Sequence, residues 1–194
     1  MSPTLAALAP ILRALNALRA RGLVQEYALG GAAGAMWFTE AMYTEDLDVF
    51  CHLEVPSPEA VALAIADLRP PSAAGYLPIA GSTHQDSVAI EGVPVQFLVG
   101  GPLVDEAISQ ALAVTIAGEP TRVFDLEYLF AIALDVRRVK DRLRIEQLLE
   151  VSTRPVDKAR LREILGRHVP SKPHRGEETL AARWEKLERE REEN

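Results

Sequence analysis

The chain has 194 residues, 48% hydrophobic and 25% charged, so we expect one globular domain with a small appendage and enough chain to bury a core. The formal net charge of −7 argues against indiscriminate binding to nucleic acid, which depends on phosphate neutralisation, and leaves room for a local basic patch. No window approaches about 18 consecutive apolar residues, so we expect no membrane span and no membrane partner.

The first predicted element is a helix over residues 4–20. Its leucines recur at helical spacing, and Pro10 marks either a break or a start within it. No basic leader precedes this stretch, and Arg13 and Arg19 interrupt it, so we expect no signal peptide.

A short apolar run at residues 27–29 predicts a strand that ends on Gly30 and Gly31. Because glycine lacks a Cβ atom, a tight turn at this pair can bring backbone N–H groups close to an anion. The apolar run that begins at Gly31 is able to open a helix whose N-terminus favours phosphate.

Asp46 and Asp48 flank Leu47 immediately before a second strand-like run at residues 49–51. Alternation along a strand places both carboxylates on one face, where they repel each other unless a divalent cation neutralises them. Such hard oxygen ligands suit Mg²⁺ (or Mn²⁺), which usually takes one or two carboxylates together with substrate phosphates. Cys51 is the only cysteine, so no intrachain disulfide forms and the cytoplasm is the expected compartment.

The middle of the chain predicts a helix that starts with Ser57 as N-cap and ends at Arg69. Residues 87–90 and 93–98 then flank a turn at residues 91–92 and predict a hairpin. Apolar spacing predicts a further helix over residues 102–113. Residues 114–116 and 121–124 predict a second hairpin turning at 118–120, and Asp125 caps a helix over residues 126–134.

The segment from Arg137 to Arg144 holds five cations and one acid, a local net charge of +4. If it is helical, Arg137, Lys140, Asp141 and Arg144 share one face that would hold a triphosphate or an RNA backbone. The alternative is a solvated basic face, paired with neighbouring acids.

In the last part of the chain, Asp157 predicts the cap of a short helix. Leu180, Trp184 and Leu187 stand at helical spacing in a charged segment, which predicts an exposed helix docked by Trp184 on the body or on a partner. We therefore expect one domain over residues 1–150 and a helical extension over residues 151–194.

Gly-Gly at a strand end, followed by Asp-x-Asp at the start of the next strand, resembles the signature of the nucleotidyltransferase fold shared with DNA polymerase β. More narrowly, residues 23–150 resemble small bacterial nucleotidyltransferase-like proteins, including toxins of abortive-infection toxin–antitoxin pairs. The resemblance implies an α/β (α+β) fold, a mixed β-sheet flanked by helices. It also implies catalytic roles for Asp46, Asp48 and Lys140, with the two aspartates as metal ligands. The implied nucleotide-binding residues are Gly30, Gly31, Thr44, Arg137, Lys140 and Arg144.

Three positions depart from the family pattern. Gln96 stands where the family commonly has a third carboxylate, and its neutral amide offers a metal a carbonyl oxygen but accepts no proton from a nucleophile. Ala133 and Arg144 stand where many members have a lysine and an aspartate, while Lys140-Asp141 keeps the family's Lys-Asp pair.

Three functions follow. The first is metal-dependent transfer of a nucleotide from an NTP to RNA, for which the resemblance implies a tRNA end, in a toxin role restrained by an antitoxin protein. The second is a module that keeps the nucleotide pocket without turnover, which Gln96, Ala133 and Arg144 motivate. The third is transfer to a small-molecule hydroxyl.

Overall fold

Strands from both halves of the chain form one mixed sheet. The computed structural model describes residues 8–39, 44, 46–53, 87–90, 93–171 and 179–193. In this part, six strands lie in the order β3-β4-β2-β1-β6-β5. They are β1 (Val24–Leu29), β2 (Leu47–Leu53), β3 (Ser87–Ile90), β4 (Val93–Leu98), β5 (Leu112–Ile116) and β6 (Glu119–Val123). The β2–β4 and β1–β6 pairs are parallel, and the other neighbours are antiparallel.

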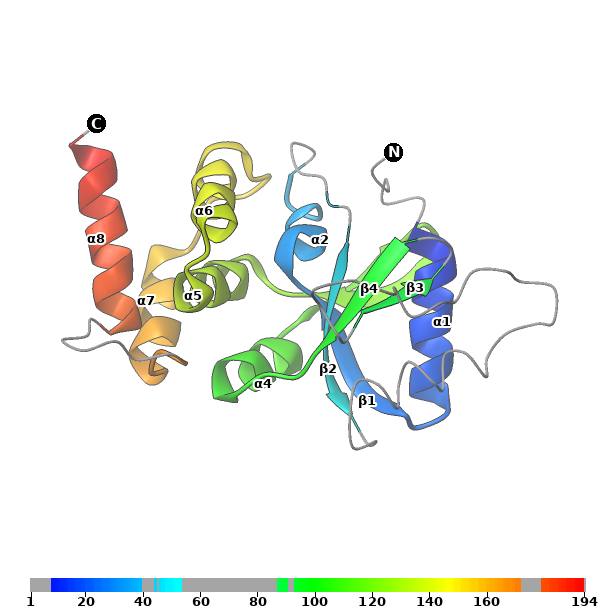
Figure 1. The fold of residues 1–194 in the computed structure, drawn as a ribbon. Coiled ribbons are helices and arrows are strands. Elements are labelled where there is room, and N and C mark those ends of the chain that lie inside the picture. Colours follow the sequence, from blue (N-terminus) through cyan, green and yellow to red (C-terminus); the bar gives the residue numbers. More distant parts are fainter. Residues whose placement is uncertain are drawn as a thin grey trace.

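Helices cover both faces of the sheet (Figure 1). α1 (Ala9–Ala20) packs on one face, and α2 (Gly31–Ala35), α4 (Pro102–Ser109) and α5 (Leu126–Val136) lie on the other. Beyond them follow α6 (Val139–Val151), α7 (Lys158–Arg167) and α8 (Leu180–Glu192). Pro10 lies in the first turn of α1, where its missing N–H costs nothing, so it marks the start of the helix. In the described residues, every helix is too short or too polar to cross a membrane.

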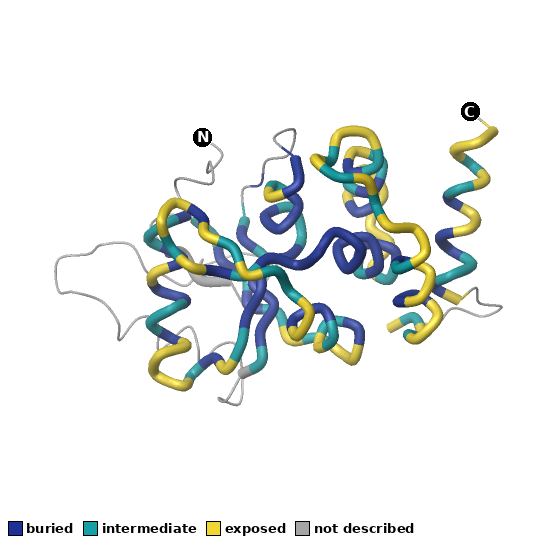
Figure 2. Tube along the Cα trace, turned by 180° about the vertical axis from the view of Figure 1, so that it is seen from behind, coloured by how far each residue is buried: buried dark blue, intermediate teal, exposed yellow. Residues whose placement is uncertain are grey.

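The sheet separates two hydrophobic clusters. One joins α1 to buried residues of the strands such as Val49, Val95 and Phe97. The other runs from Phe50 and Phe124 through the helices of the opposite side to α8. Residue-by-residue burial follows this plan, with the central strands and α5 buried and the outer surface of α8 exposed (Figure 2).

The C-terminal helix docks on the body through an aromatic contact. Trp184 is 1% exposed and meets the Phe130 ring edge-on, with 6.0 Å between centroids. The predicted docking of Trp184 on the body is therefore confirmed. Leu148 of α6 lies in the same cluster, so apolar packing is continuous across residue 150 and the domain division remains a prediction.

Two buried carboxylates anchor the start of α5. Asp125 caps the helix by accepting a 2.8 Å hydrogen bond from the Leu126 N–H, as predicted. Glu127, in the first turn, is fully buried. Arg154 pairs with both carboxylates, and Arg160 adds a second guanidinium beside them.

Glu106 of α4 forms a second polar junction with the C-terminal helices. It accepts a 2.7 Å hydrogen bond from the Tyr128 hydroxyl and pairs with Arg167 and His168. Burial raises the pKa of Glu106, but these three hydrogen bonds outweigh burial and lower the pKa to about 2.

The helix predicted over residues 102–113 is wrong at its end. α4 stops at Ser109, and Leu112 begins β5, where it pairs with Val123 of β6. Strand pairing within the β5–β6 hairpin therefore overrides the helical spacing of the apolar residues. The hairpin itself is confirmed, although it turns at Ala117 and Gly118, both with positive φ, one residue earlier than predicted. The predicted helix from Ser57 and the turn at residues 91–92 lie outside the described residues.

Candidate functional site

Asp48 and Gln96 lie side by side on the parallel strands β2 and β4, whose register pairs them. Their neighbours Leu47 and Val49 are fully buried in the cluster on the α1 side. Because strand side chains alternate, Asp48 and Gln96 point to the opposite face, where both line a cleft of about 430 Å³. Gln96 thus occupies the place beside the aspartates that the sequence predicted.

The double-glycine bend packs directly on Asp48. Gly31 has a φ of +56°, and a Cβ atom at this position would overlap the Asp48 carboxylate and lie 2.9 Å from its Cγ. The Gly30 N–H donates a 3.1 Å hydrogen bond to the Asp48 carbonyl oxygen. The bend therefore needs glycine for two reasons, its left-handed backbone and its contact with the carboxylate. The five-residue helix α2 starts at this bend.

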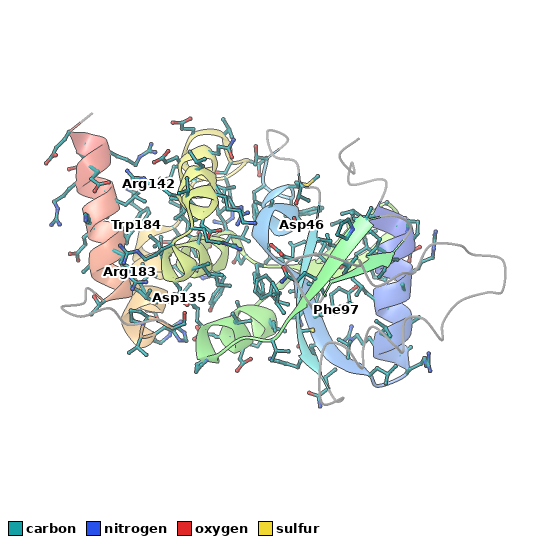
Figure 3. The ribbon with its side chains drawn as sticks, viewed as in Figure 1. Asp46, Phe97, Asp135, Arg142, Arg183 and Trp184 are labelled. Carbon is teal, nitrogen blue, oxygen red and sulfur yellow. The ribbon has the colours of Figure 1, made fainter. Side chains whose placement is uncertain are left out.

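Asp46 lies just before β2 and is held by Thr44. The buried Thr44 hydroxyl lies 2.7 Å from the Asp46 carbonyl oxygen and 2.8 Å from Oδ1, and it donates its one proton to either acceptor. In Figure 3, Asp46 lies next to α2, whereas Asp135 lies among the helices beyond it. The structure thus gives Thr44 a positioning contact with Asp46.

The environment of Asp48 disfavours its negative charge. Burial raises the pKa of the Asp48 carboxyl, and the charge of Asp46 raises it further, while Arg144, Lys140 and Arg138 act in the opposite direction. The protein therefore keeps two like-charged acids together and brings cations toward them from another element.

Those cations come from the junction of α5 and α6. The Asp141 side chain, 1% exposed, accepts hydrogen bonds from the Arg138 N–H and Nε at 3.0 and 2.8 Å. Its other oxygen accepts from Arg144 Nη1 at 3.2 Å. Arg138, Asp141 and Arg144 all line the cleft with Asp48. Arg144 is mostly buried, and burial lowers the pKa of its guanidinium. Asp141 thus orients two arginines on the wall opposite Asp48.

The prediction that Arg137, Lys140, Asp141 and Arg144 share one helix face is wrong for Arg137. Arg137 ends α5 with a φ of +60°, and α6 begins only after Arg138. The chain has to turn between two helices at this point, and a left-handed residue makes that turn. Arg137 faces a different pocket, and Lys140 is exposed at the start of α6, outside the cleft wall.

The donor set of the cleft fits a magnesium ion that shares its ligands with a substrate. Asp48 and Gln96 line the cleft and supply a carboxylate and an amide oxygen, the ligand type that Mg²⁺ prefers, and the Asp46 carboxylate lies near enough to raise the pKa of Asp48. In the described part of the chain, no group of three or more His, Cys, Asp or Glu side chains is placed to hold a metal. The phosphates of a nucleotide would therefore have to supply further ligands.

Sequence reasoning missed part of the cleft wall. Arg138 and Asp135 line the cleft, and neither was predicted as a site residue. Arg138 had a usable signal, since Asp141 stands three residues after it, the spacing at which an acid in the first turn accepts from the N-cap N–H, and the Asp141 carboxylate accepts hydrogen bonds from both the N–H and the guanidinium of Arg138. Asp135 had no such signal because its position depends on how α5 packs.

No protein-family model matches the chain, and no curated protein sequence matches it. Among solved structures, it is similar to an antigenic nucleotidyltransferase-like protein from Paracoccidioides brasiliensis, with a TM-score of 0.64 and 14% identity. The match covers 97% of this chain and 89% of that chain. At this identity the likeness concerns architecture alone. The chain accordingly has a mixed α/β fold of the nucleotidyltransferase-like type.

Proposed function

We propose that the protein is a metal-dependent nucleotidyltransferase that transfers NMP from an NTP to an acceptor hydroxyl. One observation carries the proposal. A partly buried aspartate with a like-charged neighbour packs on a glycine bend and faces two arginines across a cleft of about 430 Å³. This volume lies within the roughly 300–1,000 Å³ of sites that enclose a small molecule.

Each element of the cleft has a role in this proposal. Asp46 and Asp48 would hold Mg²⁺ or Mn²⁺, with the amide oxygen of Gln96 beside Asp48. When bound, the ion neutralises charge on the transferred phosphoryl group. Arg138 and Arg144 bind phosphate oxygens from the opposite wall, where arginine offers a fork of donors. Lys140 adds charge at the rim.

For the acceptor we propose RNA, such as a tRNA end, and a toxin role with a cognate antitoxin. The support is the sequence resemblance of the Gly-Gly and Asp-x-Asp motifs to toxin-type nucleotidyltransferases. Because the net charge is −7, the chain as a whole repels phosphates, so RNA would have to bind to a local cluster of cations.

A second candidate is a module that binds nucleotide without turnover. Gln96 favours it, because an amide beside Asp48 cannot accept the proton of an attacking hydroxyl. The bonds from Asp141 to both Arg138 and Arg144 also favour it, since part of the positive charge on that wall is already balanced.

Incubation of the protein with Mg²⁺ or Mn²⁺, labelled NTPs and RNA tests the proposal. We expect labelled RNA from the native chain and none from Asp46→Ala or Asp48→Asn. Calorimetry of Mg–NTP binding runs in parallel. Binding without product would establish the second candidate, and labelling that persists in both variants would reject the first.

A further inference from the structure

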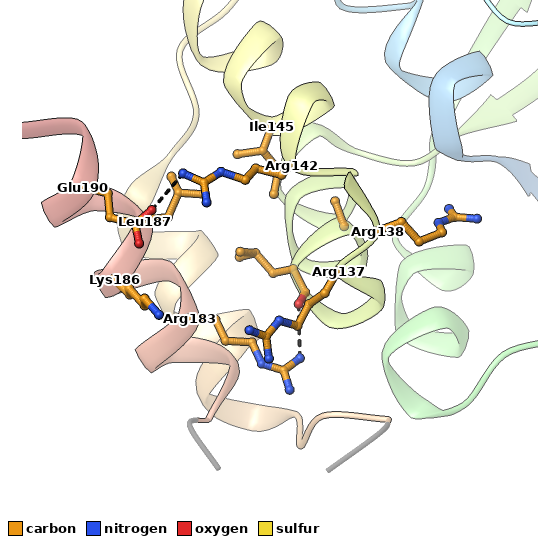
Figure 4. Close-up of a pocket in the computed structure, with 10 residues that line it drawn as sticks. Arg137, Arg138, Arg142, Ile145, Arg183, Lys186, Leu187 and Glu190 are labelled. Carbon is orange, nitrogen blue, oxygen red and sulfur yellow. Dashed lines mark hydrogen bonds and ion pairs between the residues drawn. The ribbon is translucent and has the colours of Figure 1, made fainter. Parts of the chain in front are cut away.

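A second, basic pocket lies between the end of α5, the start of α6 and the C-terminal helix α8 (Figure 4). Its volume is about 230 Å³. Five cations and one acid line it, and they are Arg137, Arg138, Arg142, Arg183, Lys186 and Glu190. The cations come from segments some 40 residues apart, so the folded chain gathers them.

Two of these cations are available for a ligand. Arg142 pairs with Glu146 and Glu190. In the described part of the chain, by contrast, Arg137 and Lys186 form no ion pair with an acid. Figure 4 shows the side chains of both in the space between α5 and α8.

The helix dipole does not account for this cluster. Carbonyl groups at the C-terminal end of α5 carry partial negative charge and attract cations. Arg183 already neutralises this charge, because it donates hydrogen bonds to the carbonyl oxygens of Leu134 and Asp135 at 3.2 and 3.3 Å. Arg183 is almost fully buried in this role. Arg137 and Lys186 therefore add charge that the end of the helix does not need.

The backbone conformation of Arg137 also indicates that its side chain has a function. It closes α5 in the left-handed conformation, where glycine or asparagine is the usual residue and an arginine is held at a conformational cost. Strained residues that persist in this way concentrate at functional sites. The arginine side chain, rather than the turn, thus explains the residue at this position.

The volume and the position of the basic pocket restrict the kind of ligand that it can bind. A volume of about 230 Å³ is below the roughly 300–1,000 Å³ of pockets that enclose whole small molecules, so only an anionic group of a larger ligand enters. Ala133 and Arg138 line both this pocket and the cleft with Asp48, so the two sites share a wall. The Arg138 side chain points away from the basic pocket, toward α2 and the strands (Figure 4).

We propose that this pocket is a second phosphate-binding site, in which Arg137 and Lys186 bind a phosphate group of a ligand that continues outside it. The ligand is either a nucleotide or a single-stranded nucleic acid, and both present the same phosphate chemistry. The site is independent of the nucleotidyl transfer proposed above, because it uses neither aspartate and requires no metal.

The test measures binding in EDTA, without turnover, to two probes: ATP by calorimetry and a labelled ten-nucleotide single-stranded RNA by fluorescence anisotropy. The variants are Arg137→Ala and Lys186→Ala. The matched control is Arg21→Ala, which removes an exposed cation at the end of α1, on the other side of the sheet. We expect each pocket variant to weaken one probe about tenfold relative to the control.

Which probe responds identifies the source of the phosphate. If RNA responds, the slope of log affinity against log salt also falls by about 0.7 per lost phosphate contact. Arg137→Gly separates the effect on binding from the effect on stability, because glycine adopts the left-handed turn without strain. We expect this variant to bind the probes as weakly as Arg137→Ala does and to have a higher Tm than Arg137→Ala.

Two results would overturn the site. One is native protein that binds neither probe, and the other is pocket variants that bind both probes as tightly as Arg21→Ala. Failure of the transfer assay leaves this test intact, since no step here requires Asp46 or Asp48.

Discussion

Replacing Gly31 with alanine separates the backbone role of the glycine bend from its role beside Asp48. Gly22 offers a matched control, because it also has a positive φ, +71° against +56° for Gly31, but has nothing within 4 Å of where a Cβ atom would lie. Alanine in the left-handed region costs about 1–2 kcal/mol at either position. At about 2–4 °C per kcal/mol for a chain of this size, both variants should lose roughly 2–8 °C in Tm.

Only Gly31→Ala should also damage the cleft. Its new methyl group would overlap Asp48 Oδ2 and lie 2.9 Å from Cγ, so the carboxylate oxygen, as the nearer atom, would have to move further than the 0.5 Å that brings Cγ to the 3.4 Å of ordinary contact. The carboxylate ends a short side chain at a cleft, so it moves before the strands do. A misplacement approaching 1 Å costs about 100-fold in a positioned site, and we expect a loss of that size in kcat/KM for transfer.

Urea denaturation and calorimetry with Mg²⁺ and a nonhydrolysable NTP check the two halves of this prediction. The expected pattern is similar destabilisation of both variants, with nucleotide binding and transfer impaired only in Gly31→Ala. If Gly31→Ala bound the nucleotide and turned over as Gly22→Ala does, the bend would not be part of the site.

Three further substitutions test the polar groups of the fold. Asp48→Asn should raise the free energy of unfolding at neutral pH. The folded-state pKa of Asp48 is raised above its usual 3.8, so ionisation of this carboxyl destabilises the folded protein at pH values above 3.8. The stability gain of the variant over wild type should therefore vanish when the pH is lowered below 3.8. A variant less stable than wild type at pH 7 would show that the charge is well accommodated. Glu106→Gln should cost about 1–3 kcal/mol in urea denaturation. Because the pKa of Glu106 is lowered to about 2, its contribution is present above about pH 4.5 and is lost as the pH falls toward 2, so equal stability of the two proteins at pH 7 would contradict the prediction. Arg154→Ala removes an ion-pair partner from both buried carboxylates at the start of α5 and should lower the free energy of unfolding by about 3–5 kcal/mol. Arg142→Ala, at an exposed ion pair, should lower it by at most about 1 kcal/mol. Similar losses of stability in the two variants would refute this prediction.

Local sequence signals located the centre of the cleft. A glycine pair at a strand end and aspartates at the start of the next strand are adjacent in the chain, and β1 and β2 pair directly, so their meeting follows from short-range structure. The position of Gln96 beside Asp48 followed from the hairpin pattern together with the family resemblance.

Features that depend on packing rather than on local spacing were not predictable. The helical spacing of the apolar residues before Leu112 extended the predicted helix past the point where the β5–β6 hairpin begins, at the pair of Leu112 with Val123. The charge run around Arg137 gave no sign that the chain turns within it and sends its cations to two different sites. Likewise, the sequence around Glu127 does not indicate that its ion-pair partner is Arg154, 27 residues later.

The parallel pairing of β1 with β6 has a consequence for how the chain folds during synthesis. Leu29 reaches its register partner only at Val123, 94 residues further on. At about 5–20 residues per second, a ribosome needs roughly 5–20 s to supply β6 after β1 has emerged. Throughout that interval one edge of β1 has no β6 beside it, so the growing chain exposes backbone groups that are able to pair with another chain.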